Sequence, residues 1–199
     1  MATGNEVPQT LSFQQRQLLE QQHEILALLH ADNEHESHYH QMMAEVLREG
    51  YAAEYDRVFG GIQPEMSISE CNLVRDILLM FRVLGNSIDR LPEPDRTTLG
   101  NENERHLRFG GFDLNDPRES RMLGYVKHML ANDEWEEIKP RLSEIGDCGN
   151  SHSRQLPTYE RMLAAFNRIY SEGTQSLHAD LLKVEDIKQI ADAWPWSGN

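Results

Sequence analysis

A glycine pair between two phenylalanines, in the stretch FGGFD at residues 109–113, is the first feature with possible chemistry. A glycine-rich loop that leads into a helix can bind phosphate through its backbone N–H groups. A Walker-type phosphate loop ends in Gly-Lys-Ser or Gly-Lys-Thr, whereas this pair is followed by Phe112 and Asp113. A dinucleotide-binding loop needs a third glycine and a preceding strand, and the sequence predicts neither. Asp113 and Asp116 would also place negative charge where an anion should bind, so phosphate binding is disfavoured.

We interpret the pair as a structural corner in a helical protein. Gly110 and Gly111 supply backbone angles that other residues avoid, which lets both flanking phenylalanines turn inward. Asp116, Pro117 and Glu119 have the pattern of a helix N-cap, a first-turn proline and a third-position acid. The residues of the predicted corner are Gly110, Gly111, Asp113, Asp116 and Glu119.

Histidines are concentrated in the stretch HADNEHESHYHQ, residues 30–41. Side chains three or four residues apart share a helix face, and histidine with carboxylate is a ligand set for zinc. The segment is strongly polar and has no HExxH motif, which favours pH-sensitive surface histidines. We therefore expect no metal and no cofactor. The candidate ligands, if the segment did bind an ion, are His30, Glu34, His35 and His38.

Several tyrosines lie next to glycines or at helix starts. A tyrosine joins a polar tip to an apolar body, which suits a core edge, a subunit interface or a pocket rim. Packing at the core edge is the first interpretation and an interface is the alternative. The binding or interface candidates are Tyr51, Tyr55, Phe112, Tyr125, Tyr159 and Arg161.

The composition disfavours several classes of partner. Asp and Glu number 33 against 19 Lys and Arg, which gives a formal net charge of −14 and opposes binding to nucleic acid or to anionic membranes. No apolar run approaches the ~20 residues needed to span a bilayer. The N-terminal residues lack the pattern of a signal peptide, and Cys71 and Cys148 have no metal-ligand spacing. We expect a cytoplasmic protein with two reduced thiols.

Apolar periodicity and capping signals predict that helices position these residues. Ser67 with Glu70 forms a capping-box pattern before a strongly periodic helix that reaches about residue 91. Ser12 with Gln15 predicts a second capped helix. The predicted helices are about 12–29, 32 or 33 to 50 or 59, 67–91, 116–130, 157–170 and 184–193, with a further one in 132–144 broken at Pro140. The polar, turn-rich segments 92–105 and 146–157 are predicted to be loops or lids.

The predicted fold is therefore all-α. We expect an irregular bundle of six to seven helices in one domain over residues 11–193, with tails at 1–10 and 194–199, and a homo-oligomer.

Four segments, taken in order, resemble those of the bacterial YfbU family. They are LREGYAAEYDRVF, FGGFDLNDPRESRMLGYVKHML, PTYERMLAAF and VEDIKQIADA. The resemblance implies an all-α, cytoplasmic, oligomeric protein with a connection to stress responses at most, and it assigns no role to any residue. The shared positions are Tyr51, Gly111, Phe112, Asp113, Glu119, Tyr125, Tyr159 and Arg161, and the histidine segment is not among them.

Two functions from different classes remain open. The first is a non-catalytic module, interacting or regulatory, that recognises another protein. The alternative is an enzyme with a site built across helices, such as a metal-assisted hydrolase, with Asp113, Glu119, His128 and Arg161 as its candidate residues.

Overall fold

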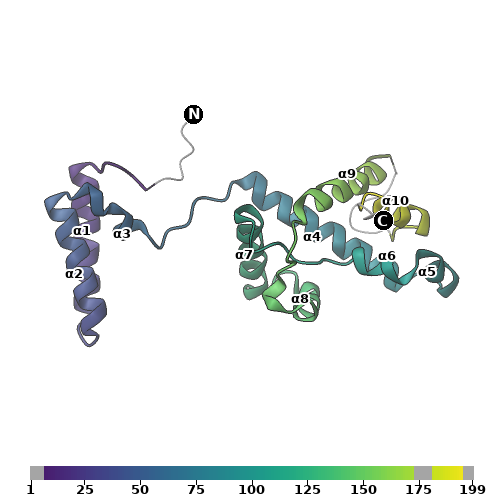
Figure 1. The fold of residues 1–199 in the computed structure, drawn as a ribbon, viewed down its shortest axis with the longest axis horizontal. Helices are drawn as coiled ribbons and strands as arrows, with labels where there is room; N and C mark the ends of the chain where they lie inside the picture. The colour runs from purple at the N-terminus through teal and green to yellow at the C-terminus, as the bar shows by residue number, and fades with distance from the viewer. Residues whose placement is uncertain (1–6, 173–180, 195–199) are drawn as a thin grey trace. The chain divides into compact units, whose positions relative to one another are not determined.

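The protein is all-α, as predicted (Figure 1). The computed structural model describes residues 7–172 and 181–194. These residues contain ten α-helices and three short 3₁₀ helices, and their one β-type pairing is an isolated bridge between Phe112 and Asn150. Of the predicted tails, residues 1–6 and 195–199 lie outside the described part of the chain.

The chain divides into two compact units, Met1–Glu65 and Met66–Asn199, where the sequence led us to expect one domain. Residues 60–65 separate them, and this exposed segment contains two glycines and a proline but no helix. Each unit has its own hydrophobic cluster, because apolar side chains on either side of the segment pack with neighbours in their own unit.

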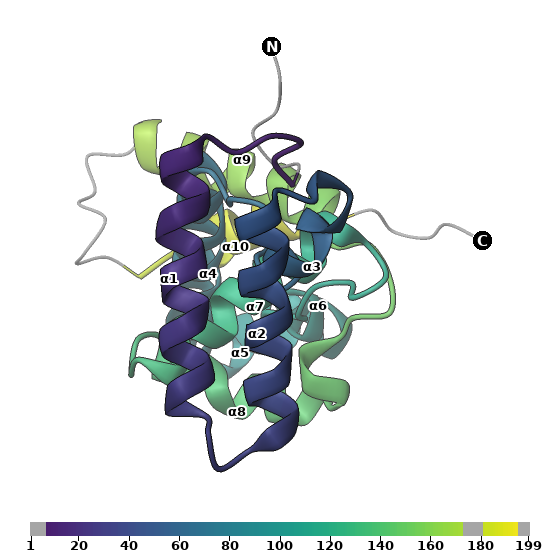
Figure 2. The ribbon, with the colours of Figure 1, turned by 90° about the vertical axis from the view of Figure 1, so that its left-hand side faces the viewer.

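The first unit is a helical hairpin followed by a short helix. Helices α1 (Phe13–Leu29) and α2 (Glu34–Glu49) run antiparallel side by side, and α3 (Tyr55–Phe59) follows (Figure 2). The predicted capping box begins α1: the Ser12 hydroxyl accepts the Gln15 N–H at 3.2 Å, and Gln15 Oε1 accepts the Ser12 N–H at 2.9 Å. Gly50, in the left-handed conformation at φ 76°, ends α2, so the earlier of the two predicted helix ends is confirmed.

The second unit is arranged around α4 (Ile68–Asp89), which begins with the predicted Ser67–Glu70 capping box. Its apolar face lies at three- and four-residue spacings and is buried in the main core. The remaining helices are α5 (Glu93–Leu99), α6 (Asn101–His106), α7 (Pro117–Ala131), α8 (Lys139–Ile145), α9 (Leu156–Glu172) and α10 (Val184–Ala191).

The prediction that residues 92–105 form a loop is wrong. Pro94 lies in the first turn of α5, where its missing N–H costs no helical hydrogen bond, and Leu99 is buried at the end of that helix. Pro140 likewise lies in the first turn of α8 and does not break a helix. These short helices raise the number of described α-helices above the six or seven predicted.

Residues 146–155 are mostly irregular, as predicted. Asp147, Cys148 and His152 all have positive φ, a conformation that costs energy for residues other than glycine. Helix α9 then begins at Leu156, one residue before the predicted start.

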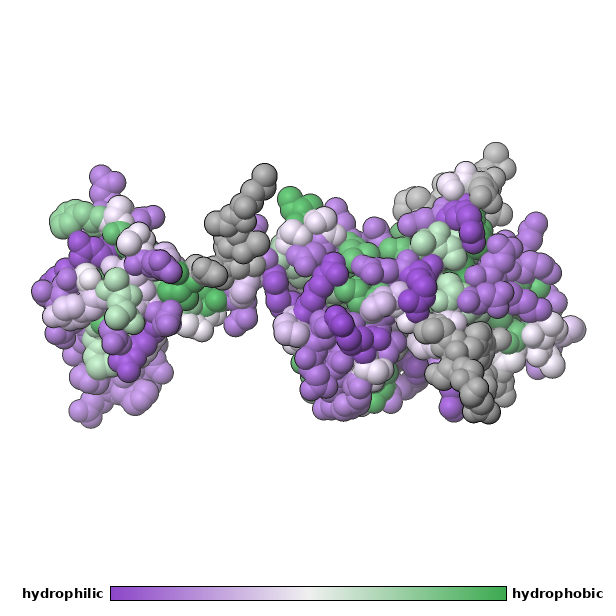
Figure 3. Space-filling model, turned by 45° about the horizontal axis from the view of Figure 1, so that its top comes forward, coloured by the Kyte–Doolittle hydropathy of each residue, from purple (hydrophilic) through white to green (hydrophobic). Residues whose placement is uncertain are grey.

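No helix of the described residues is long and apolar enough to cross a membrane. In the space-filling view, hydrophilic side chains cover much of the visible surface of the Met66–Asn199 unit (Figure 3).

Candidate functional site

The glycine pair makes a close backbone crossing with residues 149–151. The Phe112 N–H donates to the Gly149 carbonyl at 3.2 Å, and the Ser151 N–H donates to the Phe112 carbonyl at 3.1 Å. Gly111 has φ +80°, and a Cβ built on it would lie 2.0 Å from the Gly149 carbonyl oxygen. Both the backbone angle and the close approach therefore require glycine at 111.

The carboxylate of Glu119 joins this crossing to two helices. Its side chain is buried, with 1% of the residue exposed, and accepts three backbone N–H bonds. The donors are Asp113 at 2.9 Å, Gln155 at 3.0 Å and Leu156 at 2.8 Å. Two of these N–H groups open α9, so a carboxylate carried by α7 caps the N-terminus of α9.

Asp116 caps α7 itself. One of its carboxylate oxygens accepts the N–H groups of Arg118 and Glu119, each at 3.0 Å, and the other lies 2.7 Å from Arg154 Nη2. The N–H of Glu119, followed by the positive charge of Arg154, holds the pKa of Asp116 below its ordinary value. Asp113 accepts the backbone and side-chain N–H groups of Asn115 at 2.9 and 3.0 Å, which forms a local turn.

Tyr159 of α9 completes the corner from inside the core. Its hydroxyl accepts the Gly110 N–H at 3.0 Å and donates to the Gly111 carbonyl at 3.0 Å. Burial raises the pKa of Tyr159, so the hydroxyl keeps its proton and remains a donor. The ring meets those of Phe81 and Phe112 edge to face, with centroids 5.0 and 5.6 Å apart.

These contacts occupy three of the backbone donors that an anion at the corner would use. The N–H groups of Gly110, Phe112 and Asp113 all donate to oxygen atoms of the protein. Glu119 also places a carboxylate at the start of α9, where a phosphate would otherwise bind. The chemistry of this region is therefore that of a structural junction.

Three of the predicted interface residues are buried inside the protein. Phe112 and Tyr159 are fully buried and Tyr55 is 3% exposed, so a partner cannot reach these three side chains in the folded chain. Tyr51 is 52% exposed, and half-buried Tyr125 accepts a hydrogen bond from Arg75 Nε at 2.8 Å.

The candidate residues of the hydrolase have separate partners. The His128 ring stacks on Tyr125 with centroids 6.4 Å apart, and Arg161 donates to the Ala193 carbonyl at 3.2 Å and to Thr158 Oγ1 at 3.0 Å. The oxygens of Glu119 are taken up by backbone N–H groups. The bond from the Asp113 N–H to Glu119 connects two of the four candidates through the backbone, and no described hydrogen bond or ion pair joins His128 or Arg161 to either of them, so the geometry offers no shared site for the four.

The histidine segment has its centre at His40, which was not one of the predicted ligands. The Nδ1 atoms of His23 and His40 lie 3.0 Å apart, and the His30 ring stacks on His40 with centroids 5.7 Å apart. Partial burial, and secondarily the charge of His40, lowers the pKa of His23. Within residues 7–172 and 181–194 no three His, Cys, Asp or Glu side chains are grouped to hold a metal ion, and the predicted ligands Glu34, His35 and His38 are exposed.

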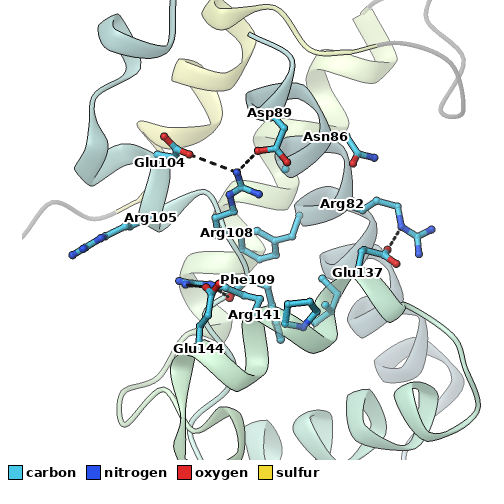
Figure 4. Close-up of a pocket in the computed structure, with 14 residues that line it drawn as sticks. Arg82, Asn86, Asp89, Glu104, Arg105, Arg108, Phe109, Glu137, Arg141 and Glu144 are labelled. Carbon is cyan, nitrogen blue, oxygen red and sulfur yellow. Dashed lines mark hydrogen bonds and ion pairs between the residues drawn. The ribbon is translucent and has the colours of Figure 1, made fainter. Parts of the chain in front are cut away.

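A charged cleft in the second unit was not predicted from the sequence (Figure 4). It has a volume of about 870 Å³ and is lined by segments of α4, α6 and α8 and by the turns before α7 and α8. Phe81, Phe109 and Ile138 contribute apolar side chains that are at least 95% buried. The charged residues that line it are Arg82, Asp89, Glu104, Arg105, Arg108, Glu137, Arg141 and Glu144.

Ion pairs hold several of the charged side chains that line the cleft. Arg108 pairs with Asp89 of α4 and lies 3.6 Å from Glu104 of α6. Glu104 also binds the Arg96 guanidinium through two hydrogen bonds, and this contact is the main cause of its lowered pKa. Glu104 is therefore held as a carboxylate at neutral pH.

Arg82 and Arg141, which also line the cleft, are paired with carboxylates as well. Arg82 pairs with Glu137 and stacks over the Trp135 ring, with the guanidinium carbon 3.8 Å from the ring centroid. Arg141 donates to the Phe109 carbonyl at 3.1 Å and pairs with Glu144 at 3.0 Å. Three of the four arginines that line the cleft are thus held by partners within the protein.

Arg105 differs from the other arginines of the cleft. It is exposed on α6 and has no ion-pair partner among the residues that the structure describes, and in Figure 4 its side chain points away from Arg108 and from the other labelled side chains. The cleft as described holds four arginines and four carboxylates, although the whole chain has a net charge of −14. Sequence reasoning missed it because its residues come from segments up to 63 positions apart, one of which was interpreted as a loop.

Comparison with known proteins gives two matches that cover most of the chain. A family model described as the YfbU domain matches residues 10–193, which include parts of both compact units. A UPF0304 protein of the archaeon Methanocaldococcus jannaschii is 27% identical over 183 residues, which cover 92% of this chain and 99% of that protein. The resemblance was to a bacterial family, and this relative is archaeal. The chain belongs to the YfbU family.

Proposed function

We propose that this protein is a non-catalytic regulatory module that binds a polar segment of another protein in the charged cleft. The main observation that supports this proposal is the cleft of about 870 Å³, in which equal numbers of arginines and carboxylates surround apolar side chains. A polypeptide segment offers both charge signs, amide donors and acceptors and apolar groups, so each part of this lining has a counterpart in such a ligand.

The chemistry of the lining supports binding more than catalysis. The described lining residues include no Ser, Thr, Cys, His, Lys or Tyr, the side chains most often used as nucleophiles or proton carriers. Their acids lie in ion pairs, and the lowered pKa of Glu104 makes it a poor general acid at neutral pH.

Arg105, which has no ion-pair partner within the described part of the chain, supports an acidic contact on the partner. A guanidinium without a protein carboxylate can take up a carboxylate from a ligand in bidentate geometry, and arginine is enriched at such contacts. The free thiols of Cys71 and Cys148 agree with the reducing cytoplasm as the place of action.

Capture of partners from a nuclease-treated native lysate tests the proposal. We expect a protein that is retained by the wild-type chain and reduced at least about tenfold by Arg105→Glu, because the charge reversal repels an acidic contact. Arg168→Glu is the matched control, since Arg168 is an exposed arginine on α9 outside the cleft. Equal capture by the wild type and both variants would contradict binding in the cleft, and loss of capture on nuclease treatment would point to nucleic acid.

A further inference from the structure

The outward half of α1 carries no charged side chain. The half that faces α2 holds the polar contacts of the hairpin: Arg16 donates to the Leu47 carbonyl at 3.2 Å, and Glu20 pairs with Arg48 at 2.8 Å. At 100° per residue, eight consecutive positions around the helix lie on the opposite side. These positions, called here the α1 outer face, are Gln14, Gln17, Leu18, Gln21, Gln22, Ile25, Leu28 and Leu29.

The apolar members of the α1 outer face are strongly exposed. Leu18 and Ile25 are 59% and 57% exposed, and Leu28 and Leu29 are 77% and 73% exposed. Large apolar side chains gathered on one helix face, with no charge among them, mark an interaction surface. The contrast is sharp because 26% of the residues of the chain are charged.

We infer that the α1 outer face pairs with the same face of a second copy of this chain. Two identical chains of net charge −14 repel each other, so a contact surface without charged side chains avoids adding local repulsion between like charges. The α1 outer face meets that condition, and its chemistry is self-complementary. Leucine and isoleucine pack on their own kind, and the glutamine amide is both donor and acceptor, so glutamines can pair across the contact.

The order of residues along the helix favours a parallel pair. Glutamines occupy most of the first half of the face, and Ile25, Leu28 and Leu29 occupy the second half. A two-fold axis alongside α1 places each residue near its own equivalent, so that apolar residues meet apolar residues and amides meet amides. Leu18 and Ile25 are seven residues apart, and Leu28 and Leu29 lie three and four residues after Ile25. These intervals are the spacing of a coiled-coil seam.

Molar mass by light scattering, measured on the full-length chain over a range of concentrations, is the first test. We expect the wild type to approach twice the 23.0 kDa chain mass, and the double variant Leu18→Glu/Ile25→Glu to keep the mass of one chain. Ile68→Glu is the matched control, because Ile68 is an 81% exposed isoleucine outside the face and should leave the dimer intact. A wild type with the mass of one chain up to the highest concentration, or a double variant that remains dimeric, would overturn the inference.

Oxidative cross-linking tests the face and its direction without depending on the fold of the double variant. Ile25→Cys should form a disulfide-linked dimer much faster than Gln41→Cys, since Gln41 is exposed on α2, away from the proposed contact. The wild type, with Cys71 and Cys148, gives the background rate. Equal rates for Ile25→Cys and Gln41→Cys would overturn the assigned face, and faster linkage through Gln21→Cys than through Ile25→Cys would overturn the parallel direction.

Discussion

Glu119 and Leu156 lie 37 positions apart in sequence, and Glu119 Oε1 accepts the Leu156 N–H at 2.8 Å. The second carboxylate oxygen accepts the N–H groups of Asp113 and Gln155. One buried side chain thus joins the end of the glycine corner, the first turn of α7 and the first turn of α9.

Glu119→Gln should lower the free energy of unfolding by about 2–3 kcal/mol. The substitution removes the charge and turns one acceptor into an amide donor that faces a backbone N–H, so a buried donor loses its bond. Urea unfolding followed by circular dichroism measures the change. Glu160→Gln removes an exposed carboxylate from the same unit and should alter the value by less than about 0.5 kcal/mol. Similar values for both variants would mean that Glu119 does not hold the junction.

Gly111→Ala and Gly124→Ala should change stability in opposite directions. An alanine Cβ at 111 would lie 2.0 Å from the Gly149 carbonyl oxygen at a positive φ, so we expect a loss of more than about 2 kcal/mol. Gly124 is within α7 with open space around it, and alanine there should add roughly 0.5–1 kcal/mol. Thermal melts of the two variants check the signs, and a stable Gly111→Ala chain would contradict the close backbone crossing.

Tyr159→Phe should cost about 1–2 kcal/mol of unfolding free energy, since it leaves the Gly110 N–H without its acceptor while the ring packing is kept. Tyr51→Phe, at an exposed tyrosine, serves as the control and should be near neutral. Chemical denaturation of both variants at neutral pH gives the comparison. An unchanged midpoint for Tyr159→Phe would show that the hydroxyl contributes nothing to the corner.

Asp116→Asn should flatten the acid dependence of stability. The pKa of Asp116 is held below its ordinary value in the folded chain, mainly by the Glu119 N–H, so its carboxylate stabilises the fold above the unfolded pKa. That contribution is lost as the pH falls through the folded pKa. Urea midpoints between pH 7 and pH 3 should therefore decline less for Asp116→Asn than for the wild type.

Arg154→Gln separates the two causes of this shift. It removes the ion pair at 2.7 Å but keeps the backbone hydrogen bonds, so most of the wild-type acid dependence should remain. If Arg154→Gln flattened the profile as much as Asp116→Asn, the ion pair and not the helix cap would be the main cause.

Local signals in the sequence predict much of this fold. Ser12 with Gln15 and Ser67 with Glu70 identify helix starts correctly, because a capping box is complete within four residues and needs no tertiary partner. Gly50 identifies a helix end for the same reason. The helices of segment 92–105 were not predicted because they are short and polar. The buried side chain of Leu99 packs α5 against the core, and this contact is not visible in the local sequence.

The candidate site depends on contacts over long sequence distances. Glu119 was expected to form hydrogen bonds at the start of its own helix, since no local sequence signal indicates a contact with the start of α9. The cleft likewise needs Arg82 of α4, Glu104 of α6 and Arg141 of α8 to be brought together, and no single segment carries that pattern. The sequence also does not show which aromatic side chains are exposed to a partner, and Phe112 and Tyr159 are buried in the folded chain.

Site-specific photo-cross-linking from the cleft tests the proposed function most directly. Asn86 lines the cleft and Asn167 is exposed on α9 outside it, so a photoreactive residue at each position forms a matched pair. Binding in the cleft predicts that the 86 probe captures a discrete protein from native lysate, that the 167 probe does not, and that Arg105→Glu abolishes the capture. No discrete product from position 86, or the same products from both positions, would contradict it.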